Sequence, residues 1–228
     1  MEAFIPILIV ALVAYGVWAL LKRITGSSRQ SDDAATLQRL IGKQNEPSEK
    51  LKAEDSASAV KIARELLANP DSLAILDTET TGIGNDCEII QVGIIDGHGN
   101  TLLDTLVKPS NAMSWPDAEA IHGISPEAVA NATGFAEIQD KIQAAVSGRQ
   151  VVIFNAKYDT RLILQSAKAA GCPAPEFESA CAMFLDSLHR AKWDKRRGHY
   201  RWYKLRGGDH TAIGDCQATL RLLTRIAK

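Results

Sequence analysis

Residues 73–82 read Leu-Ala-Ile-Leu-Asp-Thr-Glu-Thr-Thr-Gly, a short apolar run that leads straight into two carboxylates. The apolar part, residues 73–76, fits a buried strand. Asp77 and Glu79 are two residues apart, so in extended chain both side chains point to the same side. This spacing predicts a strand end that presents both carboxylates to one metal cluster, although an ordinary acidic turn before Gly82 would show the same residues.

Two further strands follow this stretch. Residues 88–95 are apolar at most positions, as expected for a strand buried on both faces, and residues 101–107 return as the next strand after a hairpin turn at 97–100. A short helix is predicted over residues 116–121. The chain then runs helix, strand and helix, with the strand at residues 150–154. The pattern predicts a three-strand meander followed by alternating helices and strands.

Polar residues that can carry chemistry stand at the starts of the later helices. Asn155 and Asp159 lie at the end of the last predicted strand and on the first turn of the helix that follows it. His210 precedes Asp215 by five residues, and Asp215 opens an amphipathic C-terminal helix. Taken singly, each has an ordinary interpretation, because carboxylates are favoured at helix starts and a histidine is common in loops.

Taken together, these segments resemble the three exonuclease motifs of the DEDD superfamily, histidine branch, the group that includes ribonuclease T and the proofreading exonuclease subunit of bacterial DNA polymerase III. The matching segments are Asp77-Thr-Glu-Thr-Thr-Gly, His122-Gly-Ile, Asn155-Ala-Lys-Tyr-Asp159, and His210 with Asp215. The resemblance extends over about residues 72–228. It implies an α/β fold, a ribonuclease H-like mixed sheet of about five strands flanked by helices, which agrees with the pattern of elements.

The resemblance also implies a metal-dependent 3′-to-5′ exonuclease. Phosphodiester hydrolysis develops charge on the attacking and leaving oxygens, which two divalent cations stabilise, here two Mg²⁺ or Mn²⁺. Asp77, Glu79 and Asp215 are expected to hold this pair, with Asp159 bound largely through water. His210 is expected to be the general base that accepts a proton from the attacking water. Without cations, four converging carboxylates would repel one another, so the cluster makes sense chiefly as a ligand set.

Four other residues are implied as contacts to the substrate. Thr80 and Thr81 would offer their backbone or hydroxyls to the terminal nucleotide, His122 would approach the same nucleotide, and Asn155 would order the site. His122 also fits an ordinary residue at the end of a helix. The expected partners are the 3′ ends of single-stranded DNA or RNA, and the motifs do not distinguish the two because they act on the phosphodiester and the 3′ end.

Residues 190–206 form a basic stretch with eight Arg or Lys and one Asp, a local charge of +7, so the rest of the chain carries −8. Aromatic residues are interleaved with these charges, a mixture suited to phosphate contacts and base stacking on a single strand. Arg201 and Trp202 are the predicted substrate contacts. A solvated loop, or a surface for anionic lipid headgroups, are the alternatives.

Phe4–Leu21 is a run of 18 residues without charge, which as a helix would span roughly 27 Å, close to the thickness of a bilayer core. Lys22 and Arg23 follow it. This predicts a single N-terminal transmembrane anchor over residues 1–23, in the inner (cytoplasmic) membrane, with the catalytic domain in the cytoplasm. A cleaved signal peptide would need its basic residues before the run, and a buried helix of a soluble domain would keep a polar face.

Composition allows one catalytic domain. The chain has 228 residues, 46% hydrophobic and 23% charged, which suits a single packed domain with an extra segment. Residues 24–55 are polar and predict a flexible tether, and residues 56–228 are assigned to the exonuclease domain. The net charge of −1 gives no global attraction to nucleic acid, so binding requires local positive charge or metal ions. The four cysteines lack metal-ligand spacing and are interpreted as free thiols.

The sequence alone leaves three possible functions. The first is the exonuclease acting on single-stranded 3′ ends, and the second is an enzyme that trims RNA instead of degrading DNA. The third is a membrane-tethered nucleic-acid-binding protein that has lost turnover, which is disfavoured because all five motif residues are present. A homodimer is a further expectation, since some relatives dimerise.

Overall fold

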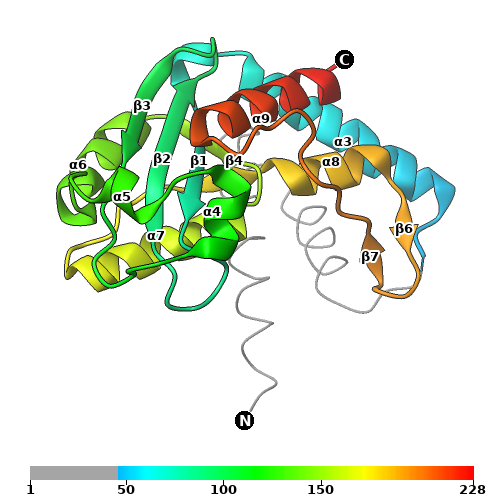
Figure 1. The fold of residues 1–228 in the computed structure, drawn as a ribbon. Helices are drawn as coiled ribbons and strands as arrows, with labels where there is room; N and C mark the ends of the chain where they lie inside the picture. Colours follow the sequence, from blue (N-terminus) through cyan, green and yellow to red (C-terminus); the bar gives the residue numbers. More distant parts are fainter. Residues whose placement is uncertain (1–45) are drawn as a thin grey trace.

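The computed structural model describes residues 46–228, which form a mixed sheet with helices on both faces (Figure 1). The elements in chain order are α3 (Glu49–Leu67), the 3-10 helix η1 (Pro70–Ser72), β1 (Leu73–Thr80), β2 (Ile89–Asp96), β3 (Thr101–Leu106), α4 (Pro116–His122), α5 (Pro126–Val129), α6 (Phe135–Val146), β4 (Gln150–Ile153), α7 (Ala156–Ala170), β5 (Ser179–Cys181), α8 (Ala182–Arg190), β6 (Trp193–Asp194), β7 (His199–Tyr200) and α9 (Ala212–Ile226).

The main sheet has five strands in the order β3-β2-β1-β4-β5, which confirms the predicted mixed sheet of about five strands. β1 pairs antiparallel with β2 and parallel with β4, so the central strand joins the antiparallel meander to the parallel half. Parallel pairing ends at Leu76, opposite Ile153, whereas β1 continues to Thr80 against β2 alone. The last four residues of β1 therefore extend past the end of β4.

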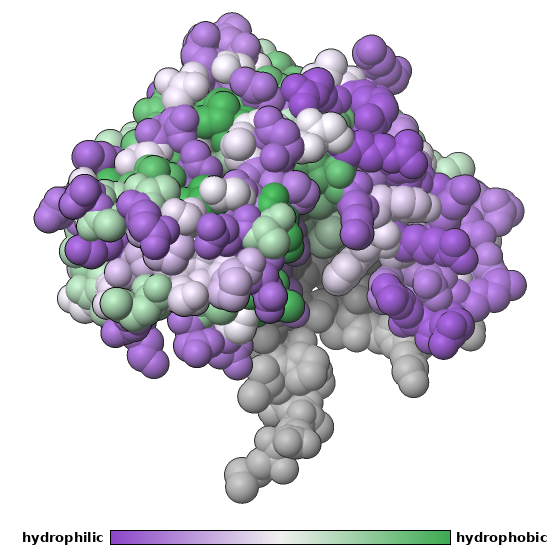
Figure 2. Space-filling view, in the orientation of Figure 1, coloured by the Kyte–Doolittle hydropathy of each residue, from purple (hydrophilic) through white to green (hydrophobic). Residues whose placement is uncertain are grey.

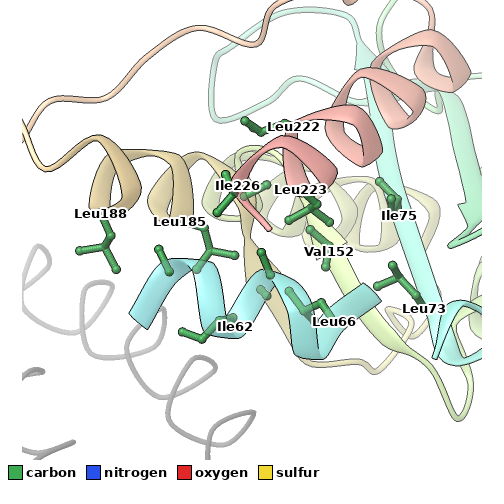
Figure 3. Close-up of a cluster of buried hydrophobic side chains, with 14 of the residues drawn as sticks. Ile62, Leu66, Leu73, Ile75, Val152, Leu185, Leu188, Leu222, Leu223 and Ile226 are labelled. Carbon is green, nitrogen blue, oxygen red and sulfur yellow. The ribbon is translucent and has the colours of Figure 1, made fainter. Parts of the chain in front are cut away.

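Two hydrophobic clusters, one on each face of the sheet, hold the fold together. Leu73 and Ile75 of β1 belong to the cluster covered by α3, α8 and α9, whereas Ala74 and Leu76 belong to the cluster covered by α6 and α7. Figure 3 shows the first cluster, in which side chains from three helices meet those of β1 and β4. Burying one such Leu or Ile contributes about 1.5–3 kcal/mol, so the alternation along β1 fixes which of its residues faces which layer.

The predicted elements agree with the structure to within a few residues, but β5 and α8 were not predicted, and three further differences bear on the site. β1 includes the carboxylates that the sequence placed after a strand ending at residue 76, because pairing with β2 continues to Thr80. Helix α3 begins at Glu49, capped by the Ser48 hydroxyl, so residues 49–55, assigned to the tether, are helical. Part of the basic stretch is a two-stranded hairpin, β6–β7, that the sequence did not predict.

The predicted membrane anchor, residues 1–23, and most of the predicted tether lie outside the described residues. Within residues 46–228, no helix combines the length and the apolar character needed to cross a bilayer.

Candidate active site

Alternate side chains of β1 serve two different parts of the site. Asp77 and Glu79 continue the row of Ile75, on the face that α9 covers, whereas Thr78 continues the opposite row, on the face that α7 covers. Asp77 and Glu79 accordingly meet Asp215 at the start of α9. The strand thus separates the site into a carboxylate side and a hydroxyl side.

The carboxylates of Asp77, Glu79 and Asp215 form an acidic triad. One oxygen from each lies within 4.8 Å of the other two. α9 can approach the strands this closely because Gly93 of β2 has no side chain: a Cβ there would lie 2.6 Å from the backbone of Ala212. The first turn of α9 is capped by Thr211, whose hydroxyl accepts the Gly214 N–H at 3.0 Å. A close strand–helix contact thus brings together carboxylates that are far apart in sequence.

The loop before α9 wraps around the carboxylate of Asp215. Its Oδ1 accepts the backbone N–H groups of Asp209 at 3.1 Å and His210 at 3.3 Å. The loop passes so close that a Cβ on Gly208 would lie 2.2 Å from the same oxygen. Asp215 is therefore oriented by backbone donors, and the glycine is needed to make room for it.

His210 lies on this loop, next to the triad, as its predicted role requires. Its backbone is in the left-handed region, with φ of 60°, which is uncommon for a residue other than glycine. The residue is exposed, and its backbone N–H bonds to Asp215. The structure places the backbone of His210 against the carboxylate of Asp215, and its role as general base stays a prediction.

Asp159 is not one of the three residues of the acidic triad, although its charge acts on Asp77. It is 4% exposed, lies on the first turn of α7, and its Oδ1 accepts the Thr78 hydroxyl at 2.8 Å across a buried contact. The four predicted carboxylates thus gather at one end of β1, but with three facing α9 and the fourth held by a hydroxyl on the α7 side. The direct or water-mediated role of Asp159 toward a metal stays a prediction.

The crowded carboxylates have raised pKa values. Burial, followed by the negative charges of Asp159, Asp215 and Glu79, raises the pKa of Asp77 well above its usual range. Burial, followed by the charges of Asp215, Asp159 and Asp209, raises the pKa of Glu79 to about 8. Burial also raises the pKa of Asp159 to about 7, against the lowering effect of the Thr78 hydrogen bond. Positive charge is therefore what this cluster lacks.

The residues of the site fit a divalent metal. The triad offers oxygen ligands only, which is the donor set that hard cations such as Mg²⁺ and Mn²⁺ prefer. A bound cation would also offset the cost of burying charged carboxylates and their mutual repulsion, the two effects that raise the carboxylate pKa values. The acidic triad is consistent with divalent metal binding.

The threonines after Glu79 shape the turn that leaves β1. The hydroxyls of Thr80 and Tyr158 lie 2.8 Å apart, and both contact the carbonyl oxygen of Gly82, at 2.9 and 2.8 Å. The Thr81 hydroxyl accepts the Glu88 N–H at 3.0 Å. The Thr80 hydroxyl is thus engaged within the protein, whereas the Thr81 hydroxyl accepts one hydrogen bond and can still donate one.

His122, at the end of α4, reaches the same turn. Its Nδ1 accepts the Ile124 N–H at 3.0 Å, so the proton is assigned to Nε2, which donates to the Thr80 carbonyl oxygen at 3.2 Å. Burial lowers the pKa of His122. A neutral imidazole with a fixed tautomer therefore joins α4 to the end of β1, close to the carboxylates.

The other predicted residues lie in two places. Asn155 precedes α7, and its carbonyl oxygen accepts the N–H groups of Tyr158 and Asp159, at 2.8 and 3.4 Å, so it helps to orient the first turn. Arg201 and Trp202 lie just after the β6–β7 hairpin, and both are exposed. No hydrogen bond or ion pair within residues 46–228 joins their side chains to the catalytic carboxylates.

Sequence reasoning missed three residues that hold the site together. Thr78 and Tyr158 stand inside the quoted motifs but were not assigned a role, because their contacts depend on how α7 packs against the sheet. Glu88 was taken only as the start of a strand. It is 2% exposed, and its two oxygens accept the backbone N–H groups of Ser110, Asn111 and Ala112.

A mixed five-stranded sheet with carboxylates at the end of its central strand and on the facing helix defines the class of ribonuclease H-like nucleases. The family model described as exonuclease, of the RNase T type, matches residues 74–223. The chain therefore belongs to the RNase T exonuclease family, and it is a phosphodiester hydrolase of DEDD type, a 3′-to-5′ exonuclease with an acidic metal-binding cluster.

Individual relatives agree with this assignment. The uncharacterized exonuclease CP81 of Escherichia phage 186 is 38% identical over 175 residues, which cover 69% of this chain and 89% of the phage protein. DNA polymerase III subunit epsilon of Escherichia coli is 34% identical over 95 residues, 37% of this chain and 39% of that subunit. The nuclease domain of 3′hExo, solved with rAMP, has the same fold at a TM-score of 0.53 and 18% identity, covering 69% of this chain and 92% of that domain.

Proposed function

We propose that the chain removes nucleotides one at a time from the 3′ ends of single-stranded nucleic acid by two-metal hydrolysis. The observation that carries this proposal is the acidic triad, with the His210 loop wrapped around one of its carboxylates. Two Mg²⁺ or Mn²⁺ ions held by Asp77, Glu79 and Asp215 would supply positive charge to the attacking and leaving oxygens. Asp159, on the α7 side, would take part through water.

The reaction is a hydrolysis in which the attacking water loses a proton and the leaving 3′ oxygen gains one. His210 accepts a proton from the water whose oxygen forms the new bond to phosphorus. The bond between phosphorus and the 3′ oxygen of the preceding nucleotide breaks, that oxygen is protonated, and the terminal residue leaves as a nucleoside 5′-monophosphate. The exposed position of His210 on the loop supports this role, because the attacking water must come from solvent.

The terminal nucleotide would lie against the turn after β1. The backbone of Thr80 and Thr81 and the ring of His122 surround this turn, and Asn155 orients the helix start behind it. Because the Thr80 carbonyl already accepts the His122 Nε2–H, a nucleotide that takes this proton would have to displace that hydrogen bond. His122 would therefore donate to the terminal nucleotide only in exchange for its contact with Thr80.

The test uses the full-length protein with single-stranded DNA and RNA of matched sequence, labelled at either end, in the presence of Mg²⁺, Mn²⁺ or EDTA. Stepwise loss of the 3′ label, absent in EDTA and in Asp77→Asn, is the expected result. Comparison of the two sugars reveals the substrate preference. Loss of label from the 5′ end first, or cleavage that persists in EDTA, would contradict the proposal.

We also propose that the enzyme is anchored in the inner membrane by residues 1–23, with its catalytic domain in the cytoplasm. The uncharged run Phe4–Leu21 and the basic residues after it support this localisation. Cell fractionation tests it: the protein should sediment with membranes and resist extraction by sodium carbonate. A protein that is released by carbonate, or found in the soluble fraction, would contradict the anchor.

A further inference from the structure

Residues 190–206, here called the basic arm, extend from the end of α8 through the β6–β7 hairpin. The hairpin pairs Trp193 with Tyr200 and Asp194 with His199, at the far side of α8 from the main sheet (Figure 1). Figure 2 shows this region as strongly hydrophilic, with the surface hollowed between it and the body of the domain. The arm is thus a defined structure beside the enzyme core.

Two aromatic residues attach the arm to the domain. Trp193 and Tyr200 meet edge to face with their ring centroids 5.3 Å apart, and Tyr200 is 5% exposed within the cluster under α3. The Tyr200 hydroxyl donates to the Asp55 Oδ2 at 2.6 Å. The buried Tyr200 ring therefore attaches the arm to the domain, and the half-buried Trp193 packs against it.

A second attachment uses Arg190 and Tyr203. The Arg190 Nε donates to both oxygens of the buried Asp186, at 2.9 and 2.8 Å, and its guanidinium lies 4.3 Å from the centroid of the Tyr203 ring. A buried, charge-assisted contact of this kind fixes the side chain. The segment that leaves the hairpin is therefore held against α8.

One aromatic pair remains at the surface. His199 and Trp202 are stacked, with centroids 5.2 Å apart and an interplanar angle of 29°, and Trp202 is 55% exposed. The histidine supports one face of the indole, so the indole is held in place although it is open to solvent. An exposed and oriented ring is what base stacking requires, and base stacking contributes substantially to single-strand binding.

Most of the positive charge around this ring forms no salt bridge among residues 46–228, although Arg197 and Arg201 lie close enough to Asp194 to lower its pKa. Of the eight basic residues in the arm, Arg190 pairs with Asp186 and Lys195 with Glu46. The remaining six form no salt bridge with any residue from 46 to 228: Lys192, Arg196, Arg197, Arg201, Lys204 and Arg206. In a protein with a net charge of −1, this concentration points to an anionic ligand.

The chain connects the arm directly to the catalytic loop. Residues 207–209 lead from the arm to His210, and the carbonyl oxygen of Gly207 accepts a hydrogen bond from Arg221 of α9 at 2.9 Å. The 3′ end of a substrate terminates at the carboxylates. Only the nucleotides on its 5′ side can therefore extend toward the arm.

We infer that the basic arm binds the single-stranded segment on the 5′ side of the nucleotide being removed. This inference rests on the proposed function. A base stacks on the free face of Trp202, and Arg196, Arg197 and Arg201 contact phosphates. The bases must be unpaired to reach the indole, so the arm favours long single strands over duplex ends and very short fragments. Anionic lipid would use the charges alone and leave the oriented His199–Trp202 stack without a role.

The test measures binding and cleavage separately with the full-length protein. Fluorescence anisotropy in EDTA gives the Kd for oligo(dT) and oligo(U) of about 20 nucleotides, longer than the roughly 4–16 nucleotides that one single-strand-binding fold covers. In Mg²⁺, the KM for these strands is compared with that for the corresponding dinucleotides. The variants are Trp202→Ala, Trp202→Phe and the double change Arg196→Ala with Arg197→Ala. Matched controls are Leu164→Ala, an exposed apolar residue of α7, and Lys168→Ala, an exposed cation near the end of that helix.

Trp202→Ala should raise the Kd and the KM for the long strands by on the order of tenfold. The ratio of the KM for long strands to the KM for dinucleotides should rise by a similar factor. Trp202→Phe should restore most of the binding. The double arginine change should lower the dependence of log Kd on log salt by about 0.7 for each phosphate that the variant no longer neutralises. The controls should leave all values unchanged.

The inference would be overturned if the arm variants had no effect, or if they affected long strands and dinucleotides equally. Binding of the same variants to phosphatidylserine and phosphatidylcholine vesicles tests the lipid alternative. Wild-type Kd for oligonucleotides together with a lost preference for phosphatidylserine would overturn the inference and assign the arm to lipid. If no substrate is cleaved but the Kd still depends on Trp202, the proposed function fails, whereas binding of single strands by the basic arm is supported.

Discussion

At the scale of single residues, the site depends on the alternation of side chains along β1. The sequence correctly predicted that Asp77 and Glu79 share one side, because that follows from the two-residue period of a strand. It could not show that Thr78 would meet Asp159, since that contact depends on how α7 packs against the other face of the sheet. The period of the strand thus predicted the carboxylate pair, whereas the contact between Thr78 and Asp159 depends on tertiary packing.

Gly208 tests whether the position of Asp215 matters for catalysis. In Gly208→Ala the new Cβ would lie 2.2 Å from Asp215 Oδ1, so the carboxylate must move. Displacements near 1 Å can cost on the order of 100-fold in rate, and we expect kcat/KM to fall by about that factor. Gly134→Ala is the control, because that position has open space around it and φ of −71°. Equal activity in the two variants would show that the loop does not position Asp215.

Thr78 tests the buried contact on the α7 side. Thr78→Val keeps the shape but removes the hydroxyl that donates to Asp159, and it leaves a buried carboxylate oxygen without this partner. We expect the free energy of unfolding to fall by about 1–3 kcal/mol, measured by urea denaturation. Thr105→Val in β3 makes the same change where the hydroxyl bonds only to the neighbouring Leu106 carbonyl. A loss of similar size in both variants would argue against a special role for Thr78.

At the scale of elements, the long and strongly patterned segments were predictable and the short ones were not. The meander, β4 and the helix that Asp215 opens follow from apolar runs and turn residues. β5 has three residues and β6 and β7 have two each, too few for any periodicity to stand out. The hairpin forms because Trp193 and Tyr200 pack into a cluster built largely by distant helices. Its aromatic residues were therefore interpreted as possible ligand contacts, when two of them are anchors.

Glu88 tests how one buried side chain positions a whole segment. It accepts three backbone N–H groups from residues 110–112, in the segment that leads to α4 and His122. Glu88→Ala leaves these donors without their acceptor, and we expect a loss of roughly 3 kcal/mol in the free energy of unfolding, with a raised KM because α4 shifts. Glu137→Ala, an exposed acidic residue of α6, should change stability by less than about 0.5 kcal/mol. Wild-type stability of Glu88→Ala would refute this role.

At the scale of the whole molecule, the acidic cluster makes stability depend on pH and metal. The folded protein holds protons on Glu79 and Asp159, whose pKa values are raised to about 8 and about 7, whereas the unfolded chain releases them near their ordinary values. In EDTA, the free energy of unfolding should therefore fall as pH rises from about 4.5 to about 8. Thermal denaturation should show Tm falling over this range. Mg²⁺ should raise Tm more at the upper end than at the lower end.

A control for this pH dependence is Glu79→Gln, which removes one of the raised carboxyls. Its Tm should depend less steeply on pH in EDTA and should respond less to Mg²⁺. If Tm of the wild-type protein instead rose with pH through this range, or if Mg²⁺ raised it equally at both ends, the carboxylates would not be competing for protons and metal.

The most direct test of a two-metal active site is to count the metal ions that it holds. Electron paramagnetic resonance of free Mn²⁺, titrated into the full-length protein with a nucleoside 5′-monophosphate present, gives the number bound per chain. We predict about two in the wild-type protein. We also predict a clear loss in Asp77→Asn, and an unchanged number in Asp117→Asn, an exposed carboxylate of α4. Binding that is absent from the wild-type protein, or unaffected by Asp77→Asn, would contradict a catalytic metal site at the end of β1.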